Sequence, residues 1–169
     1  QKTGFFLDQR ENRKLLGEFS KGKKVLNTFC YTGGFSIYAM SAGAELVTSV
    51  DISQKAVDLA ASNMELNFPN ANHKAVADDV FNFMKEHTQQ YDVIVLDPPA
   101  FAKSIKSKHT ATQAYKRLNI AGLKALAPNG ILFTFSCSQV IDDVLFYNTV
   151  AAAAIETGRN IRVLHKLEQ

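Results

Sequence analysis

The sequence contains few cysteines and no long hydrophobic run. Two of its 169 residues are cysteine, Cys30 and Cys137, and two cysteines do not suggest a disulfide framework. No apolar run approaches the ~20 residues that a membrane helix requires, and no secretory signal peptide is visible. These absences argue against a disulfide-rich secreted protein and against a membrane protein. They predict a reduced, cytoplasmic protein with no membrane partner.

Internal repeats and low-complexity linkers are absent as well. A length of 169 residues, of which 46% are hydrophobic, suggests one domain with enough material for a core. The chain begins with Gln1 and not with a methionine. We therefore expect residues 1–169 to be one domain excised from a longer protein.

Acidic residues are missing from one basic stretch. The formal net charge is only +3, but residues 103–117 contain no acid and five cations: Lys103, Lys106, Lys108, Lys116 and Arg117. Such a stretch suits contacts with the phosphates of RNA. An ordinary solvated loop would have the same composition, so both interpretations stay open.

Apolar runs alternate with helix-period segments along the chain, which predicts a doubly wound, mostly parallel α/β sheet. We expect strands at 25–29, 45–51, 73–77, 91–97, 131–135 and 161–167, and helices at 10–19, 35–42, 53–67, 80–87, 111–127 and 142–157. A turn at Pro128-Asn129-Gly130 is expected to lead into the fifth strand.

The expected strands carry acidic or nucleophilic residues at their carboxyl ends. Ligands of such sheets bind outside these ends, near the point where the strand order reverses. The residues found there are Tyr31-Thr32-Gly33-Gly34, Asp51, Asp78-Asp79, Asp97-Pro98-Pro99 and Ser136-Cys137-Ser138. Their common position predicts one site at this edge of the sheet.

The loop after the first strand lacks the G-x-G-x-x-G pattern that suits a pyrophosphate. It reads FCYTGGFS, and its paired glycines allow a tight turn and the close approach of a ligand. Asp51 follows Gly34 at nearly the ~20-residue spacing of a carboxylate that binds ribose hydroxyls. Asp79 suits an adenine amino group, with a helix N-cap as its alternative role. A ribose and an adenine without a phosphate fit S-adenosylmethionine.

The segment DPPAF at 97–101 follows the fourth strand. Its two prolines end the strand and stiffen the backbone, so Asp97 can face a flat substrate and Phe101 can stack on a base. The alternative is an aspartate that merely ends a strand before a surface turn.

The two cysteines differ in their sequence context. Cys137 lies in FTFSCS, where the chain turns polar at the end of a strand. It is either a small core residue or a nucleophile at the rim of the sheet. Cys30 lies in the glycine loop, where packing is the better interpretation.

Six segments together resemble one enzyme family. QKTGFFLDQR, VLNTFCYTGGFS, VDISQKAVDLAASNMELN, ADDVF, YDVIVLDPPAF and FTFSCS resemble segments of the class I S-adenosylmethionine-dependent methyltransferases. More narrowly, they resemble the large-subunit ribosomal RNA cytosine-C5 methyltransferases, in the same order and over nearly the whole chain. The resemblance implies a Rossmann-like catalytic domain, which we expect to lack the last strand and the preceding RNA-binding domain of that family.

The resemblance also implies roles for individual residues. Cys137 would be the nucleophile, and Asp97 would face the target base and line the cofactor site. Further contacts with S-adenosylmethionine are expected from Phe6, Asp8, Arg10, Thr32, Gly33, Gly34, Asp51, Ile52, Asp79 and Val80. Contacts with RNA are expected from Pro98, Pro99, Phe101, Lys103, Lys106, Lys108 and Tyr115, and no metal is expected.

In that family's chemistry a thiolate adds to C6 of cytosine, C5 takes the methyl group, and a base removes the C5 proton as the cysteine leaves. Two features depart from related groups: the first strand offers Asn27 in place of an acid, and DPPAF lacks a second cysteine. Three alternatives stay open. They are an RNA guanine or adenine amine methyltransferase, an RNA- and cofactor-binding domain without turnover, and a nicotinamide-dependent oxidoreductase.

Overall fold

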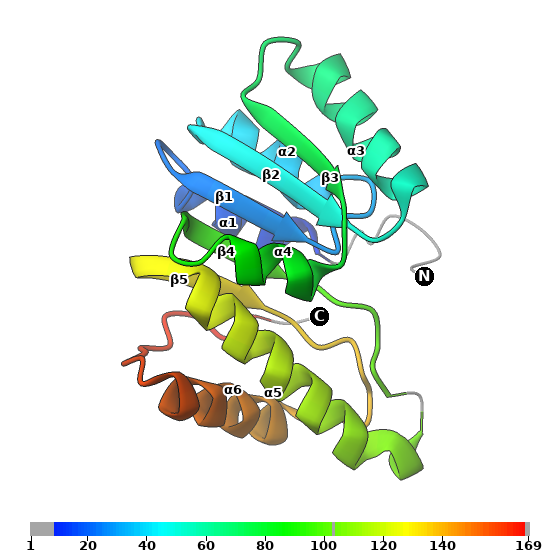
Figure 1. The fold of residues 1–169 in the computed structure, drawn as a ribbon, viewed down its shortest axis with the longest axis vertical. Coiled ribbons are helices and arrows are strands. Elements are labelled where there is room, and N and C mark those ends of the chain that lie inside the picture. The colour runs from blue at the N-terminus through cyan, green and yellow to red at the C-terminus, as the bar shows by residue number, and fades with distance from the viewer. Residues whose placement is uncertain (1–8, 103, 168–169) are drawn as a thin grey trace.

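Five parallel strands form a single sheet in the order β3-β2-β1-β4-β5 (Figure 1). The structure, a computed structural model of the chain, describes residues 9–102 and 104–167. The strands are β1 (Lys24–Thr28), β2 (Leu46–Asp51), β3 (His73–Ala77), β4 (Tyr91–Leu96) and β5 (Leu126–Thr134). The strand order reverses between β1 and β4, which is where such sheets bind their ligands.

Helices cover both faces of the sheet. One face carries α1 (Arg10–Glu18), α2 (Gly34–Ser41) and α3 (Gln54–Asn67), and the other carries α4 (Val80–Glu86) and α5 (Lys108–Ala125). The last helix, α6 (Asp143–Thr157), lies alongside α5 (Figure 1), and a short 3-10 helix, η1 (Ile105–Ser107), precedes α5. No helix in the described part of the chain is long and apolar enough to span a membrane. The doubly wound α/β fold expected from the sequence is confirmed.

Successive side chains of the central strands pack on opposite faces of the sheet. Val25 belongs to the core cluster that contains Leu16 of α1, whereas Leu26 belongs to the cluster that contains Leu118 of α5. In β4, residues 93 and 95 join the first cluster, and residues 94 and 96 join the second. A strand that is covered on both faces is apolar at nearly every position. This is why the central strands could be located from apolar runs.

Side chains at the start of three helices fix where these helices begin. Ser53 Oγ accepts a hydrogen bond from Ala56 N at 3.4 Å, ahead of α3. Asp79 caps α4, and Asp142 Oδ1 accepts a bond from Leu145 N at 2.9 Å, ahead of α6. Such caps satisfy backbone N–H groups that have no partner within the helix. Because the first two caps follow β2 and β3, they also fix the loops at the carboxyl edge of the sheet.

The strand expected at 161–167 does not form. Residues 159–167 follow α6 without regular structure, and Ile161, Val163 and Leu164 are 43%, 55% and 54% exposed. The ring of His165 contacts Phe19 at the end of α1, so the segment packs there and makes no ladder with β5. Apolar residues favour a strand, but a strand also needs a hydrogen-bonding partner.

The fifth strand begins at Leu126 and not at residue 131. The expected turn at 128–130 lies inside β5, opposite an irregularity in its pairing with β4. Asn129 has a positive φ of 60°, and a side chain at Gly130 would come within 2.8 Å of the carbonyl oxygen of Asp92. These residues therefore disturb the strand locally, as in a bulge, without ending it.

Candidate active site

Hydrogen bonds join the carboxyl ends of neighbouring strands into one edge. After β1, Tyr31 N donates to Asp51 Oδ2 at 3.1 Å, and after β3, Asp78 N donates to the carbonyl oxygen of Asp51 at 3.1 Å. On the other side of the reversal point, where β4 pairs with β5, Phe135 N donates to the carbonyl oxygen of Leu96 at 2.9 Å. All five strands point the same way (Figure 1), so the described residues expected at the strand ends meet at this edge.

The glycine loop after β1 has a constrained backbone. Tyr31 and Gly33 have positive φ values of 48° and 80°, a region in which a non-glycine residue stores strain. A side chain at Gly33 would lie 3.1 Å from the Cβ of Ala60 in α3. From the same helix, Asn63 Nδ2 donates to the carbonyl oxygen of Thr32 at 2.9 Å. α3 therefore fixes the loop, and glycine at position 33 permits this close approach.

Asp51 is half-buried and is held by two backbone N–H groups. Its Oδ1 accepts a bond from Ser53 N at 3.0 Å, and its Oδ2 accepts the bond from Tyr31 N. The neighbouring Ile52 is 75% exposed. A fixed carboxylate next to an exposed apolar side chain suits a ribose that carries a flat base.

Asp79 is the N-cap of α4, as the alternative interpretation of the sequence predicted. Its Oδ1 accepts bonds from Phe81 N and Asn82 N at 3.0 and 3.1 Å. The adjacent Val80 is 3% exposed, because its side chain belongs to the core beneath α4. A cofactor contact from Val80 would therefore involve its backbone.

The ends of β4 and β5 bring Cys137 next to the Asp-Pro-Pro segment. The exposed Cys137 thiol donates to the carbonyl oxygen of Pro98 at 3.5 Å. Asp97, one residue earlier, is 7% exposed. Pro98 is buried and Pro99 is exposed. Cys137 therefore lies at the rim of the sheet and is not a core residue.

Buried hydrogen bonds of Ser138 hold the segment of Cys137 and the loop after the Asp-Pro-Pro segment in place. Ser138 Oγ accepts a bond from Ala102 N at 3.3 Å and lies 2.9 Å from the Tyr115 hydroxyl oxygen. Ser138 and Tyr115 are 3% and 0% exposed. This buried node ties three segments together: the loop after the Asp-Pro-Pro segment, the residue after Cys137, and α5.

Tyr115 is completely buried, although a contact with RNA was expected for it. It shares the inward face of α5 with Ala111 and Leu118, because residues three or four apart lie on one side of a helix. Its ring packs against Phe101, with 4.7 Å between the ring centroids. Tyr115 therefore belongs to the packing behind the site. Phe101 is only half-buried, so part of its ring stays accessible.

Cys30 has the opposite environment to Cys137. It is 6% exposed. Burial, and to a smaller extent the negative charge of Asp51, raises the pKa of the Cys30 thiol to about 12. Such a thiol is almost fully protonated at neutral pH and is a poor nucleophile. Of the two cysteines, only Cys137 has an accessible thiol.

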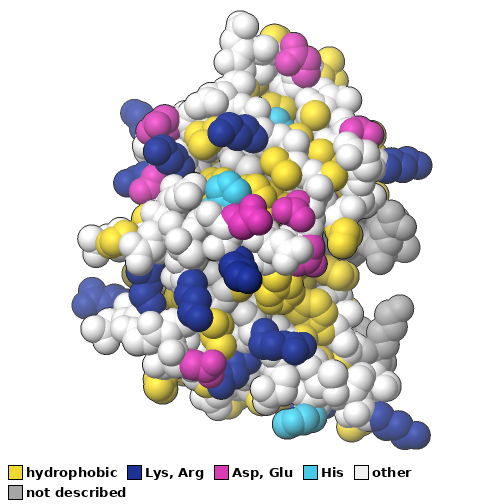
Figure 2. All heavy atoms as spheres, viewed as in Figure 1, with side chains coloured by type: hydrophobic (Ala, Val, Ile, Leu, Met, Phe, Trp, Pro, Cys, Tyr) yellow, Lys and Arg dark blue, Asp and Glu magenta, His cyan; other side chains and the backbone are white. Residues whose placement is uncertain are grey.

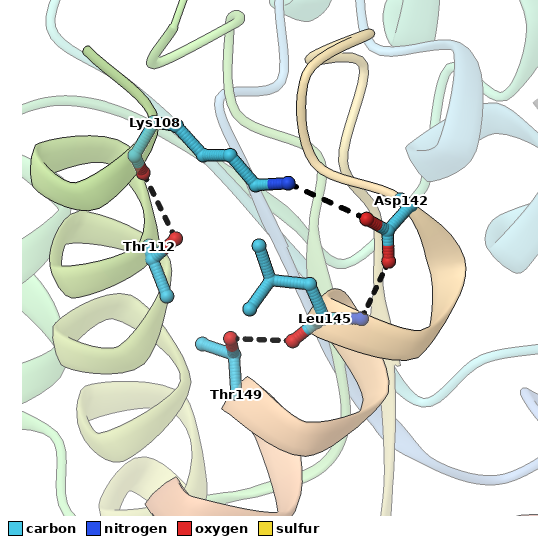
Figure 3. A network of polar contacts seen from close by, with 5 residues as sticks. All are labelled: Lys108, Thr112, Asp142, Leu145 and Thr149. Carbon is cyan, nitrogen blue, oxygen red and sulfur yellow. Dashed lines mark hydrogen bonds and ion pairs between the residues drawn. The ribbon is translucent and has the colours of Figure 1, made fainter. Parts of the chain in front are cut away.

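The basic segment is partly compensated by acids. Lys106 is exposed on η1, whereas Lys108 Nζ lies 3.4 Å from Asp142 Oδ2 at the start of α6 (Figure 3). Asp142 therefore caps α6 and binds Lys108 at the same time. On the face of the molecule that carries α4 and α5, Figure 2 shows several Lys and Arg side chains.

Three of the expected site residues, Phe6, Asp8 and Lys103, lie outside the described residues. Arg10 is the exposed first residue of α1. Arg13 lies over the ring of Tyr38 at 5.6 Å, and Gly17 faces Ala42, so α1 and α2 run in the same direction. Arg10 precedes Arg13 by about one turn. It is therefore level with the start of α2, on the side of the sheet edge that carries the glycine loop.

A buried polar chain beneath the glycine loop was not expected. Asn27 Nδ2 donates to Ser36 Oγ at 2.8 Å, Ser36 Oγ lies 2.7 Å from Ser49 Oγ, and Ser49 Oγ lies 2.8 Å from His73 Nε2. The chain links β1, α2, β2 and β3 and holds the first turn of α2 against the sheet. In the sequence, only the polar residues Asn27 and Ser49 within otherwise apolar strands could have indicated this chain.

Comparisons with known proteins concern the family and the fold of the chain. The S-adenosylmethionine-dependent methyltransferase family matches residues 1–168. The chain is 46% identical to a protein of Aeromonas hydrophila and 45% identical to one of Aeromonas salmonicida, both named Ribosomal RNA large subunit methyltransferase I. Each match covers 99% of this chain and 43% of the relative, so the chain spans less than half the length of these curated relatives.

Solved structures give the same result. SMU.776, solved in complex with SAH, is 34% identical with a TM-score of 0.78, over 90% of this chain and 41% of that one. Trm5b from Pyrococcus abyssi, at 19% identity and a TM-score of 0.73, shares the fold. The family match covers almost the whole chain, and the glycine loop and Asp51 lie at the edge where such a sheet binds its ligand. The chain therefore belongs to the S-adenosylmethionine-dependent methyltransferases.

Proposed function

We propose that the protein methylates C5 of a cytosine in large-subunit ribosomal RNA, with Cys137 as the nucleophile. The observation that carries this proposal is the exposed thiol of Cys137, 3.5 Å from the carbonyl oxygen of Pro98 and therefore beside the Asp-Pro-Pro segment. The two Aeromonas relatives, at 46% and 45% identity, are named for the methylation of this class of RNA. Their names support the choice of substrate.

S-adenosylmethionine fits the residues around the glycine loop. Asp51 would accept the ribose hydroxyls, and the exposed Ile52 would cover one face of the adenine. Because Gly33 has no side chain, the loop packs against α3 and presents its backbone to the ligand. The cofactor supplies the methyl group from its sulfonium sulfur. Further contacts are proposed from Arg10, Thr32, Gly34, Asp79, the backbone of Val80, and Asp97.

Cys137 would act by adding to the pyrimidine ring. Its thiolate attacks C6 of cytosine, which forms a carbon–sulfur bond and makes C5 an enamine-like carbon. The electron pair at C5 then forms a bond to the methyl carbon, and the bond between that carbon and the sulfonium sulfur breaks. A base removes the C5 proton, and the resulting electron pair expels the cysteine as a thiolate, leaving 5-methylcytosine.

Asp97 would bind the Watson–Crick edge of the target cytosine. A carboxylate there accepts a bond from the amino group and stabilises a protonated N3. The positive charge at N3 draws electrons from C6 and favours the attack. Asp97 is 7% exposed, and burial strengthens such a bond because water competes less. Pro98 and Pro99 restrict the backbone, and the accessible part of Phe101 offers a surface for stacking.

We also infer that residues 1–169 form the methyltransferase domain of a longer protein. The two named relatives are covered to only 43% by this chain, so more than half of each lies outside the match. A ribosomal RNA substrate would place the enzyme in the cytoplasm, where it would need no membrane partner.

Mass spectrometry of nucleosides tests the proposed function. Deproteinised large-subunit ribosomal RNA from a strain that lacks the gene would be incubated with the full-length protein and methyl-labelled S-adenosylmethionine. We expect label in 5-methylcytidine with the parent and none with Cys137→Ala. Label in an N-methylated guanosine or adenosine, retained by Cys137→Ala, would identify an amine methyltransferase instead. Cofactor binding without label in any nucleoside would indicate a domain without turnover.

A further inference from the structure

The surface formed by η1 and α5 has many cations and no acids of its own. Residues 98–141 include no aspartate or glutamate. The same stretch places five cations on η1 and α5: Lys106, Lys108, Lys116, Arg117 and Lys124. Figure 2 shows Lys and Arg side chains on the face that α4 and α5 cover. A cationic face beside a catalytic edge attracts a polyanion.

Two of these lysines are bound to α6. Lys108 Nζ lies 3.4 Å from Asp142 Oδ2 (Figure 3), and Lys116 Nζ lies 2.6 Å from Glu156 Oε2. Asp142 precedes the first turn of α6, and Glu156 is in its last turn. The two pairs therefore connect both ends of α6 to α5. Because acids of the protein already compensate these charges, they are less available to phosphates.

The other three cations are not compensated in this way. Lys106, Arg117 and Lys124 are exposed, and within residues 9–102 and 104–167 none of them forms an ion pair. Arg117 and Lys124 are two helical turns apart, so they share one face at a separation of about 10 Å. The buried Tyr115 and Leu118 lie on the other side of the helix.

We propose that Lys106, Arg117 and Lys124 form an RNA track along the outer face of α5, while Lys108 and Lys116 brace α6. This inference rests on the proposed function, because it states where the RNA lies beside the catalytic edge. α5 has 18 residues, which is about 27 Å of helix. Gln113, four residues before Arg117, is exposed on the same face and can add hydrogen bonds to phosphate or sugar.

The track begins beside Cys137 and the Asp-Pro-Pro segment and leads away from them. The bond between Tyr115 and Ser138 holds the first half of α5 next to the residue that follows Cys137. From there α5 runs back along the sheet toward the amino end of β5, where that strand begins (Figure 1). An RNA whose target cytosine reaches Cys137 would therefore lay a flanking segment on α5. Since phosphate contacts carry no sequence information, the track holds the RNA and leaves the choice of nucleotide to other parts of the site.

Charge-reversal variants of the full-length protein test the track. We expect Arg117→Glu/Lys124→Glu to bind deproteinised large-subunit ribosomal RNA about tenfold more weakly at low salt. The slope of log affinity against log salt should fall by about 1.4 to 1.8, since each phosphate contact contributes about 0.7 to 0.9. Glutamate is a good helix former, so α5 should stay folded. The control Lys21→Glu/Lys23→Glu reverses two exposed lysines in the turn before β1 and should change neither quantity.

The outcomes separate this inference from the proposed function. Equal affinity and slope for the track variant and its control would overturn the track, even if the parent methylates RNA normally. A parent that binds RNA but methylates no cytosine would contradict the proposed function, while the salt slopes still decide on the track. Lys108→Gln/Lys116→Gln should lower thermal stability slightly and leave the slope near that of the parent. A loss of slope as large as that of the track variant would contradict the bracing role.

Discussion

At the scale of single residues, Cys30 and Cys137 have the same intrinsic chemistry but different surroundings, and the surroundings decide whether the thiol is accessible. Burial and the nearby Asp51 raise the pKa of Cys30 to about 12, whereas Cys137 is exposed beside Pro98. The sequence predicted this difference, because Cys137 follows the point at which an apolar strand turns polar. The Cys30 thiol is therefore almost fully protonated at neutral pH, and of the two cysteines only Cys137 presents a thiol that a substrate can reach.

Asp51 is expected to contribute to cofactor affinity. Asp51→Ala should weaken the binding of S-adenosylhomocysteine by about 1.5 kcal/mol or more, because a hydrogen bond to a charged group is lost. Calorimetry measures the affinity, and circular dichroism checks the fold, since Asp51 also accepts a bond from Tyr31 N. The control is Asp58→Ala, which removes an exposed aspartate of α3 that binds Gln54. Equal affinities for the two variants would exclude Asp51 from the cofactor site.

At the scale of elements, the sequence predicted where the strands lie. It predicted less well which segments pair as strands and which face of a helix points inward. The strands β1 to β4 lie within one residue of the expected ranges. In the central strands β1 and β4, burial on both faces favours apolar runs, whereas the edge strand β3 has no buried residue. Residues 161–167 contain four apolar residues as well, yet they form no ladder with β5. Tyr115 stands in a basic segment, and only the spacing of Ala111, Tyr115 and Leu118 indicates that it points inward.

The buried node at Ser138 should position the loops that carry Cys137 and Asp97. Tyr115→Phe keeps the ring contact with Phe101 and removes the bond to Ser138 Oγ. We expect a loss of about 1 kcal/mol in the free energy of unfolding and a lower kcat for methylation, with unchanged cofactor affinity. Tyr147→Phe, at a tyrosine of α6 that is 57% exposed, is the control. If both variants unfold and turn over alike, the node has no positioning role.

The buried polar chain predicts a pH dependence of stability. Burial lowers the pKa of His73 below its ordinary value of 6.5, so below that pH the unfolded chain binds more protons than the folded one. The free energy of unfolding should therefore fall as the pH drops below 6.5. His73→Gln should lose less stability between pH 7.5 and 5.5 than the parent in denaturant titrations. His109→Gln, at an exposed residue of α5, should behave like the parent, and identical pH dependence in both variants would refute the role of His73.

At the scale of the whole molecule, the parallel sheet explains why motifs far apart in the sequence lie at one edge. Each strand delivers its carboxyl end to the same edge, so the glycine loop, Asp51, Asp97 and Cys137 meet there although they span more than 100 residues of the chain. The sequence predicted this edge because the motifs follow the strands directly. It did not reveal the contacts made behind the edge, such as the bonds of Ser138 and the chain from Asn27 to His73, because these depend on how the helices pack.

The most direct test of the proposed function is to trap Cys137 on RNA that carries 5-fluorocytosine at the target position. Fluorine does not leave as a cation, so the elimination that frees the enzyme is blocked after methyl transfer. We expect a covalent complex of the full-length protein that survives denaturing electrophoresis, requires S-adenosylmethionine and forms equally with Cys30→Ala. It should be absent with Cys137→Ala and with Cys137→Ser, because a serine hydroxyl supplies almost no anion at neutral pH. Methylation of unmodified RNA by Cys137→Ala at the rate of the parent, with no trapped complex in either, would contradict the cytosine-C5 mechanism.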